Sequence, residues 1–236
     1  MTNILITGGS RGIGYELVKQ FAQHADNYIV VLSRNTDKLK ALQAECLKLY
    51  NNNITIYGVD FDSPSLSDDL KQVIAQEAKH FHILVNNAGV LINQPFSETS
   101  LHNFIHIYKV NVFAPALLIK EVLQNNQPEQ LTHVVNIGSM GGFQGSAKFP
   151  DLSVYSSSKA AIANLTEVLA EEYKASNTKF NCLALGAAQT EMLNEAFPDY
   201  KAPLSAVQIA IYIHQFCITG ANYFNGKIIP VALTTP

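Results

Sequence analysis

Two side chains that could move a proton lie four residues apart on a predicted helix. Tyr155 and Lys159 share one face of that helix. A phenol with a pKa of about 10 is a weak base at neutral pH, and a neighbouring ammonium group lowers that pKa by stabilising the phenolate. Ser139 lies upstream at the end of a predicted strand, where its hydroxyl could stabilise a developing oxyanion. Such a Tyr–Lys pair is often only a surface pair, but with Ser139 it predicts general acid–base chemistry.

A glycine-rich turn follows the first predicted strand, residues 4–7. The turn contains Gly8, Ser10, Arg11, Gly12, Ile13 and Gly14, and a helical pattern begins within it. Glycines let the backbone approach a pyrophosphate closely, and the start of the helix supplies free N–H groups. Because the turn lies between a strand and a helix, it predicts a dinucleotide-binding site rather than an ordinary loop.

The end of the second predicted strand would distinguish the two nicotinamide dinucleotides. A carboxylate about 20 residues after the glycine turn binds the ribose hydroxyls of NAD(H) and repels a 2′-phosphate. This chain has Ser33 and Arg34 there, and Arg11 in the glycine turn. Two guanidinium groups suit a dianionic phosphate. We therefore predict NADP(H) in preference to NAD(H), the alternative being that both arginines are solvated surface residues.

The composition excludes several other classes of protein. The chain has 236 residues, 47% of them apolar and 15% charged, with a net charge of −3. It is too apolar for a disordered chain and lacks the basic stripe of a dedicated nucleic-acid binder. The widely spaced cysteines Cys46, Cys182 and Cys217 predict free thiols in a reducing compartment. Neither a signal peptide nor a membrane-spanning run is evident, so we expect a cytoplasmic protein without a membrane partner.

Predicted strands alternate with predicted helices along the chain. The strands are residues 4–7, 28–32, 54–59, 83–86, 133–137, 180–185 and 227–232, and clear helical segments are 12–24, 37–49 and 65–80. This alternation predicts a doubly wound α/β fold, with a seven-stranded parallel sheet and helices on both faces. We expect one domain over residues 1–236, with a short apolar substrate lid at 187–206.

Two predicted helices, residues 102–126 and 155–173, are apolar almost all round. A helix of this kind is covered on every side. One side should face the sheet and the other a second copy of the chain, as in a homodimer or homotetramer. Pro115 lies inside the first segment and should kink it.

Five motifs occur in the order found in the short-chain dehydrogenases/reductases. They are Thr7-Gly8-x-x-x-Gly12-x-Gly14, Asn86-Asn87-Ala88-Gly89, Asn111, Ser139 and Tyr155-x-x-x-Lys159. Over essentially its whole length the chain resembles the compact, single-domain branch of that family. The resemblance implies a Rossmann-type fold and an enzyme that transfers a hydride between NADP(H) and a carbonyl or alcohol substrate.

The resemblance also implies roles for individual residues. Tyr155 would be the general acid/base, assisted by Ser139. Lys159 would lower the pKa of Tyr155 and bind the nicotinamide ribose, and Asn111 would hold a water that connects the lysine to solvent. The cofactor would be lined by Asp60 and Phe61 near adenine, by Asn87, Ala88 and Gly89 after the fourth strand, and by Thr190 at the carboxamide, besides the glycine turn.

The sequence departs from the family pattern at three places. Leu185 stands where proline is usual, Asn225 replaces a common aspartate, and the spacing of 16 residues from Ser139 to Tyr155 is slightly long. These departures concern the substrate more than the reaction, and the lid favours a small or moderately hydrophobic carbonyl compound.

Other functions stay open. The first is reduction of a 3-oxoacyl group on an acyl-carrier protein, although Glu171-Glu172 do not suit an acidic partner. An epimerase or dehydratase, and a redox sensor that binds NADP(H) without turnover, are further possibilities. His102 and His106 lie four residues apart, but without a third ligand they predict no metal site.

Overall fold

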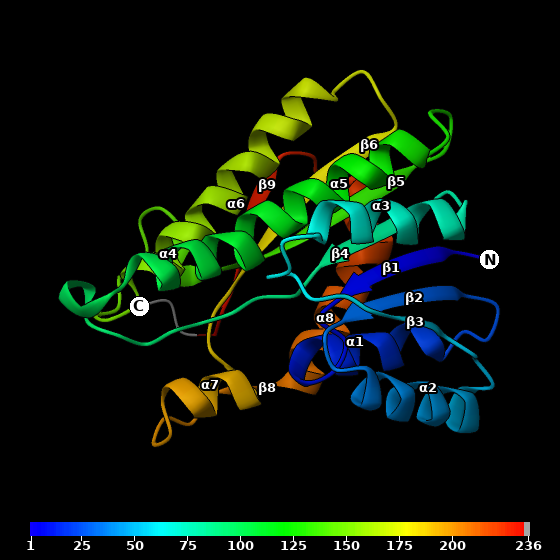
Figure 1. Ribbon diagram of the computed structural model, residues 1–236. Helices are drawn as coiled ribbons and strands as arrows, with labels where there is room; N and C mark the ends of the chain where they lie inside the picture. The colour runs from blue at the N-terminus through cyan, green and yellow to red at the C-terminus, as the bar shows by residue number, and fades with distance from the viewer. Residues whose placement is uncertain (234–236) are drawn as a thin grey trace.

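A seven-stranded parallel sheet forms the centre of the computed structural model, which describes residues 1–233 (Figure 1). Residues 234–236 of the expected domain lie outside the described residues. The strands, in the spatial order β3-β2-β1-β4-β5-β6-β9, are β1 Asn3–Thr7, β2 Tyr28–Ser33, β3 Thr55–Gly58, β4 Ile83–Asn86, β5 Thr132–Ser139, β6 Thr178–Leu185 and β9 Lys227–Val231. The order reverses between β1 and β4, which is where such sheets bind ligands. The predicted fold class is confirmed.

Helices cover both faces of the sheet. One layer contains α1 Gly12–Ala22, α2 Thr36–Tyr50 and α8 Ala206–Thr219, and the other contains α3 Leu66–Glu77, α4 Leu101–Tyr108, α5 Ala114–Asn125 and α6 Ser153–Glu172 (Figure 1). Successive strand residues enter opposite cores, because side chains alternate across a strand. Ile4 and Ile6 pack against the first layer, and Leu5 packs against the second. This is why the strands read as continuous apolar runs.

The predicted helix over residues 102–126 is two helices. A π-helical segment, Lys109–Phe113, separates α4 from α5. Pro115 lies in the first turn of α5, directly after this segment, and has no N–H to donate. The irregular segment thus lies directly before Pro115, and the kink at the proline itself stays a prediction. π-Helical segments occur frequently at functional sites, and Asn111 lies in this one.

The segment predicted as a lid lies outside the main sheet. It contains β7 Ala188–Gln189, α7 Glu191–Ala196 and β8 Leu204–Ser205, and its two short strands pair with each other (Figure 1). Three 3₁₀ turns complete the described structure, at Phe96–Glu98, Met140–Gly142 and Gly220–Asn222. Among residues 1–233, no helix combines the length and apolarity needed to cross a membrane. That the chain is one domain stays a prediction.

Candidate active site

The first candidate residues meet at the carboxyl end of β5. Ser139 is the last residue of this strand, which extends two residues beyond the predicted strand, 133–137. Its Oγ accepts a hydrogen bond of 3.2 Å from the N–H of Gly141, so its own hydrogen can be donated elsewhere. Gly142 lets α6 approach closely, because a Cβ there would lie 2.6 Å from the backbone nitrogen of Ala160. The first turns of α6, which carry Tyr155, therefore lie beside Ser139.

Lys159 is buried one turn further along α6. Its Nζ donates a hydrogen bond of 2.8 Å to the carbonyl oxygen of Ile137 and lies 5.9 Å from the centroid of the Tyr155 ring. Burial lowers the pKa of Lys159 from 10.5 to about 8. The ammonium form therefore still predominates at neutral pH, close to the phenol.

Burial raises the pKa of Tyr155 above its ordinary value of 10.0, and a hydrogen bond from Ser139 opposes that change. The expected net lowering of this pKa is thus not found, because desolvation of the phenolate outweighs the hydrogen bond from Ser139. The phenol is protonated at neutral pH. A protonated phenol can act as a general acid.

Asn111 connects the π-helical segment to the strand end of β4. It is buried, and its Nδ2 donates to the Val90 carbonyl and to Ser158 Oγ, both at 3.0 Å. Its Oδ1 accepts a 2.8 Å hydrogen bond from the N–H of Val90. A Cβ at Gly89 would lie 3.3 Å from Asn111 Oδ1 and 3.4 Å from Lys159 Nζ. All four residues predicted to be catalytic therefore surround one end of the sheet.

The glycine turn has the features that a dinucleotide needs. Gly8 and Gly12 have φ angles of 76° and 59°, which favour glycine, and a Cβ at Gly14 would lie 2.3 Å from the Gly8 carbonyl oxygen. Helix α1 begins at Gly12 with no side-chain cap and no acidic residue in its first turn. The side chain of the capping residue therefore accepts no hydrogen bond from the first N–H groups of α1, and these groups are available to a pyrophosphate. The residues present fit the predicted cofactor.

Two residues fix the glycine turn against β4. Asn87 Nδ2 donates to the carbonyl oxygens of Thr7 and Gly8, at 2.9 and 3.2 Å. Thr7 Oγ1 accepts the N–H groups of Asn87 and Ala88, at 3.1 and 3.0 Å. This role of Thr7 was not predicted from the sequence, although its place in the Thr-Gly motif was the available signal. These bonds hold together the two strands that flank the switch point.

The predicted phosphate-selecting residues lie on two neighbouring turns. Ser33 Oγ donates a 2.9 Å hydrogen bond to Ser10 Oγ, which joins the end of β2 to the glycine turn. Arg34 is exposed beside this bond. The guanidinium group of Arg11 forms a bidentate ion pair with Glu195 of α7. Glu195 was not predicted as a partner of Arg11, because no local pattern in the sequence links the two residues.

The remaining predicted cofactor residues occupy different surroundings. Asp60 is exposed, and its carboxylate accepts the N–H of Asp62 at 3.0 Å. Phe61 is buried and packs in the core beneath α3 and α5. Thr190 Oγ1 caps α7 by accepting the N–H of Leu193 at 3.2 Å, and its methyl group lies close to Gly12. Ile13 packs against the core formed with α8. Among these residues, the structure brings Thr190 next to the glycine turn.

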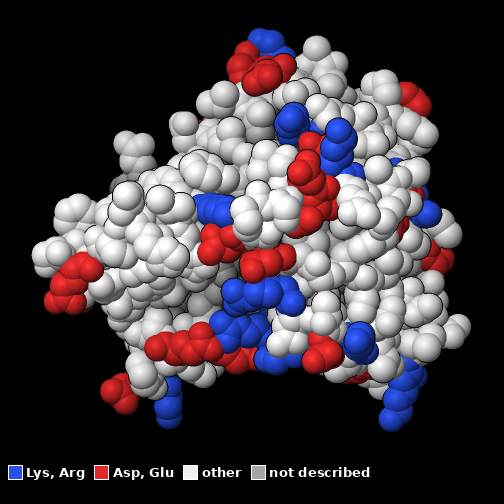
Figure 2. Space-filling view, in the orientation of Figure 1, with Lys and Arg blue, Asp and Glu red and all other residues white. Residues whose placement is uncertain are grey.

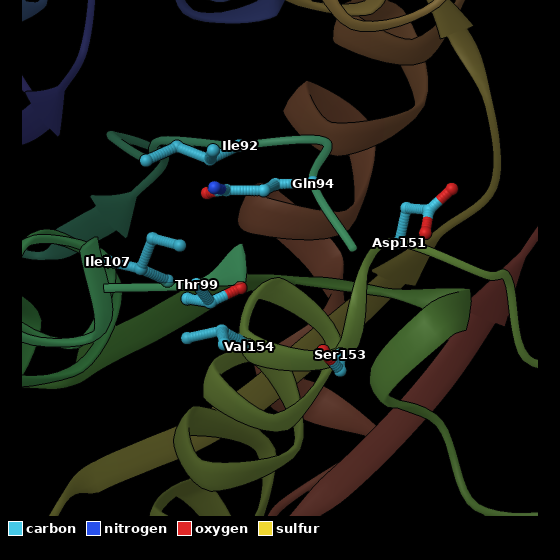
Figure 3. Close-up of a pocket in the computed structure, with 7 residues that line it drawn as sticks. All are labelled: Ile92, Gln94, Thr99, Ile107, Asp151, Ser153 and Val154. Atoms are coloured by element: carbon cyan, nitrogen blue, oxygen red, sulfur yellow. The ribbon is translucent and has the colours of Figure 1, made fainter. Parts of the chain in front are cut away.

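A small cavity borders the long connection between Ser139 and Tyr155 (Figure 3). It is lined by residues from the segment before α4, from α4, from the connection itself and from the start of α6, namely Ile92, Gln94, Thr99, Ile107, Asp151, Ser153 and Val154. Asp151 has a φ of 62°, and its carbonyl oxygen accepts the N–H of Gln94 at 2.9 Å. The extra residues of this connection therefore contact the segment after β4.

The other two departures from the family pattern have local consequences. Leu185 ends β6 opposite Val231, and the next N–H, of Gly186, donates to the Val231 carbonyl at 2.9 Å. Asn225 Oδ1 accepts the N–H of Phe180 at 3.0 Å in the turn before β9. Strand pairing thus runs on past the position where proline is usual.

Comparison with known proteins agrees with this geometry. The family model described as short chain dehydrogenase matches residues 2–201. The chain belongs to the short-chain dehydrogenase family, and it is an oxidoreductase of that family.

Individual relatives match over nearly the full length. The 3-oxoacyl-[acyl-carrier-protein] reductase FabG of Aquifex aeolicus is 27% identical, with 96% of this chain and 94% of that protein covered. A short chain dehydrogenase from Shigella flexneri 2a, complexed with NADP, has a TM-score of 0.88 at 23% identity, with 97% and 96% covered. ElxO with NADP bound has a TM-score of 0.82 at 25% identity, with 98% and 96% covered.

Proposed function

We propose that this protein is an NADP(H)-dependent oxidoreductase that transfers a hydride between the nicotinamide and a small carbonyl or alcohol substrate. The observation that carries the proposal is the meeting of Ser139, Tyr155 and Lys159 at the carboxyl end of β5, beside a glycine turn fitted for a dinucleotide. An acid, an oxyanion donor and a buried cation at this place support carbonyl reduction.

NADPH would supply the hydride that reaches the carbonyl carbon. Tyr155 donates its proton to the carbonyl oxygen, which its raised pKa permits at neutral pH. Ser139 donates a hydrogen bond to the same oxygen, because its Oγ is the acceptor in the bond from Gly141 and its own hydrogen is not used there. Lys159, still largely protonated at pH 7, stabilises the phenolate that remains. In the oxidative direction Tyr155 takes the proton back.

We assign the pyrophosphate to the glycine turn at the start of α1, the nicotinamide ribose to Lys159 and the carboxamide to Thr190. Gly89 leaves the space beside Lys159 that the ribose needs. Adenine is assigned to the end of β3, near Asp60 and Phe61. Arg11 and Arg34, with no carboxylate at Ser33, support NADP(H) over NAD(H). The NADP complexes of the Shigella protein and of ElxO agree with this choice.

The proposal is tested by following NADPH consumption with a panel of carbonyl compounds that includes a 3-oxoacyl-carrier protein. Wild-type protein should consume NADPH, and Tyr155→Phe should abolish turnover while leaving the NADPH Kd within about twofold, because the ring that packs in the site is kept. Substantial turnover by Tyr155→Phe contradicts the assigned role. An epimerase would regenerate its cofactor, and a sensor would bind NADPH and consume none.

We also propose that two copies of the chain pair through α4, the π-helical segment and α6. These elements expose the large apolar side chains Leu101, Ile105, Phe113 and Val168, and exposed apolar patches are typical of protein interfaces. Light scattering after size exclusion should give a dimer or tetramer. A monomer at micromolar concentration refutes the pairing.

A further inference from the structure

The end of the lid helix is bound to the glycine turn. Glu195, the second-last residue of α7, accepts hydrogen bonds from both terminal nitrogens of Arg11, one of them with an Nη2–Oε2 distance of 3.1 Å. Glu191 lies one turn earlier on α7 and adds negative charge near Arg11. Figure 2 shows acidic and basic side chains intermixed on the lower part of the face where Figure 1 places α7 and α1. The lid therefore directs carboxylates at a predicted cofactor residue.

The Glu195 carboxylate lies near two elements that are proposed to bind the cofactor, the glycine turn and the start of α2. Arg11 belongs to the glycine turn, and Lys38 lies at the start of α2, just after the end of β2. Arg11, and more weakly Lys38, lower the pKa of the Glu195 carboxyl. The turns that carry them are joined by the bond between Ser33 and Ser10. A 2′-phosphate recognised by these turns would need the same cations.

A carboxylate and a phosphate both bind guanidinium in a bidentate manner, and they use the same pair of N–H donors. Arg11 therefore cannot give its terminal nitrogens fully to both. We propose that Glu195 is a specificity-determining residue of the cofactor site, whose carboxylate competes with the 2′-phosphate of NADP(H) for Arg11. This inference rests on the proposed function.

The competition has two consequences. NAD(H) carries no phosphate on this ribose and leaves the pair intact, whereas NADP(H) has to break it, so Glu195 reduces the preference for NADP(H). Breaking the ion pair between Arg11 and Glu195 also removes one of the contacts that hold α7 in place. A second attachment, from Asn93 Nδ2 to the Ala196 carbonyl at 2.8 Å, does not involve the phosphate and keeps the helix in place.

Calorimetric titration with NADPH, NADH and 2′,5′-ADP tests the proposal without relying on turnover. Glu195→Gln should tighten NADPH and 2′,5′-ADP by about two- to fivefold, the range expected for one exposed ion pair, and should leave NADH unchanged. The gain should vanish in an Arg11→Ala background and shrink at high salt. Glu191→Gln, which removes a lid charge but no hydrogen bond to Arg11, is the matched control and should have a smaller effect.

The Arg11→Ala variant separates this inference from the function on which it rests. If Arg11→Ala weakens NADPH but Glu195→Gln leaves it unchanged or weaker, the competition is refuted and the NADP(H) assignment stands. If Arg11→Ala leaves the ratio of the NADPH and NADH Kd values unchanged, Arg11 does not bind the phosphate, and both the assignment and the competition fail.

Discussion

The buried ammonium group of Lys159 is expected to be needed for activity, but its burial destabilises the folded protein. Its pKa falls from 10.5 to about 8, and each pKa unit is worth about 1.4 kcal/mol. The charged form therefore destabilises the folded state by about 3 kcal/mol at pH 7. Lys159→Met removes this penalty but loses the hydrogen bond to Ile137, worth about 1 kcal/mol. We expect the variant to be more stable than wild type by about 2 kcal/mol at pH 7 and to lack turnover.

The gain in stability of Lys159→Met over wild type should become smaller as the pH rises. Between the folded pKa of about 8 and the ordinary value of 10.5, the unfolded state binds more protons than the folded state at Lys159. Wild-type stability from this group therefore rises as the pH increases through that window. The methionine variant does not titrate there, so most of its advantage should be gone by about pH 9.5.

Urea unfolding followed by circular dichroism at pH 7 and pH 9.5 measures both effects. Lys71→Met, on the exposed face of α3, is the control and should change stability by less than about 0.5 kcal/mol at either pH. The reasoning is refuted if Lys159→Met is less stable than wild type at pH 7, or if its advantage does not change with pH.

Two further predictions concern packing and acid stability. Gly142→Ala should destabilise the protein by about 2 kcal/mol or more and reduce kcat, because its Cβ would meet the backbone nitrogen of Ala160 at 2.6 Å; an unchanged urea midpoint contradicts the close packing. Burial lowers the pKa of His133, whose ring bonds to the Cys217 carbonyl and to Asn181. The unfolded state then binds more protons below about pH 6.5, so stability falls as the pH falls, and thermal melts from pH 7.5 to 5.5 should show a smaller loss in His133→Gln than in wild type.

Local patterns in the sequence were enough for the fold class and most of the candidate site. The five inner strands were predicted because nearly all of their residues are buried, which leaves continuous apolar runs, and the edge strands β3 and β9 were predicted although they are only partly buried. The glycine turn and the Tyr155–Lys159 pair were found because their geometry depends on residues near in sequence, a strand-to-helix turn and one turn of helix. Asn111 was found only through the family resemblance.

The tertiary structure decided what depends on distant residues. Arg11 and Glu195 are separated by 184 positions, so no periodicity relates them. The pKa of Tyr155 could not be derived from its spacing to Lys159, because burial, and the bond that turns Lys159 toward Ile137, arise only when α6 packs on β5. The π-helical segment was missed for a similar reason, since Asn111 is held there by Val90 and Ser158 rather than by its own helix. The sequence by itself determined which groups are present and which strand or helix carries each; packing set their charges and partners, because burial and long-range contacts exist only in the folded chain.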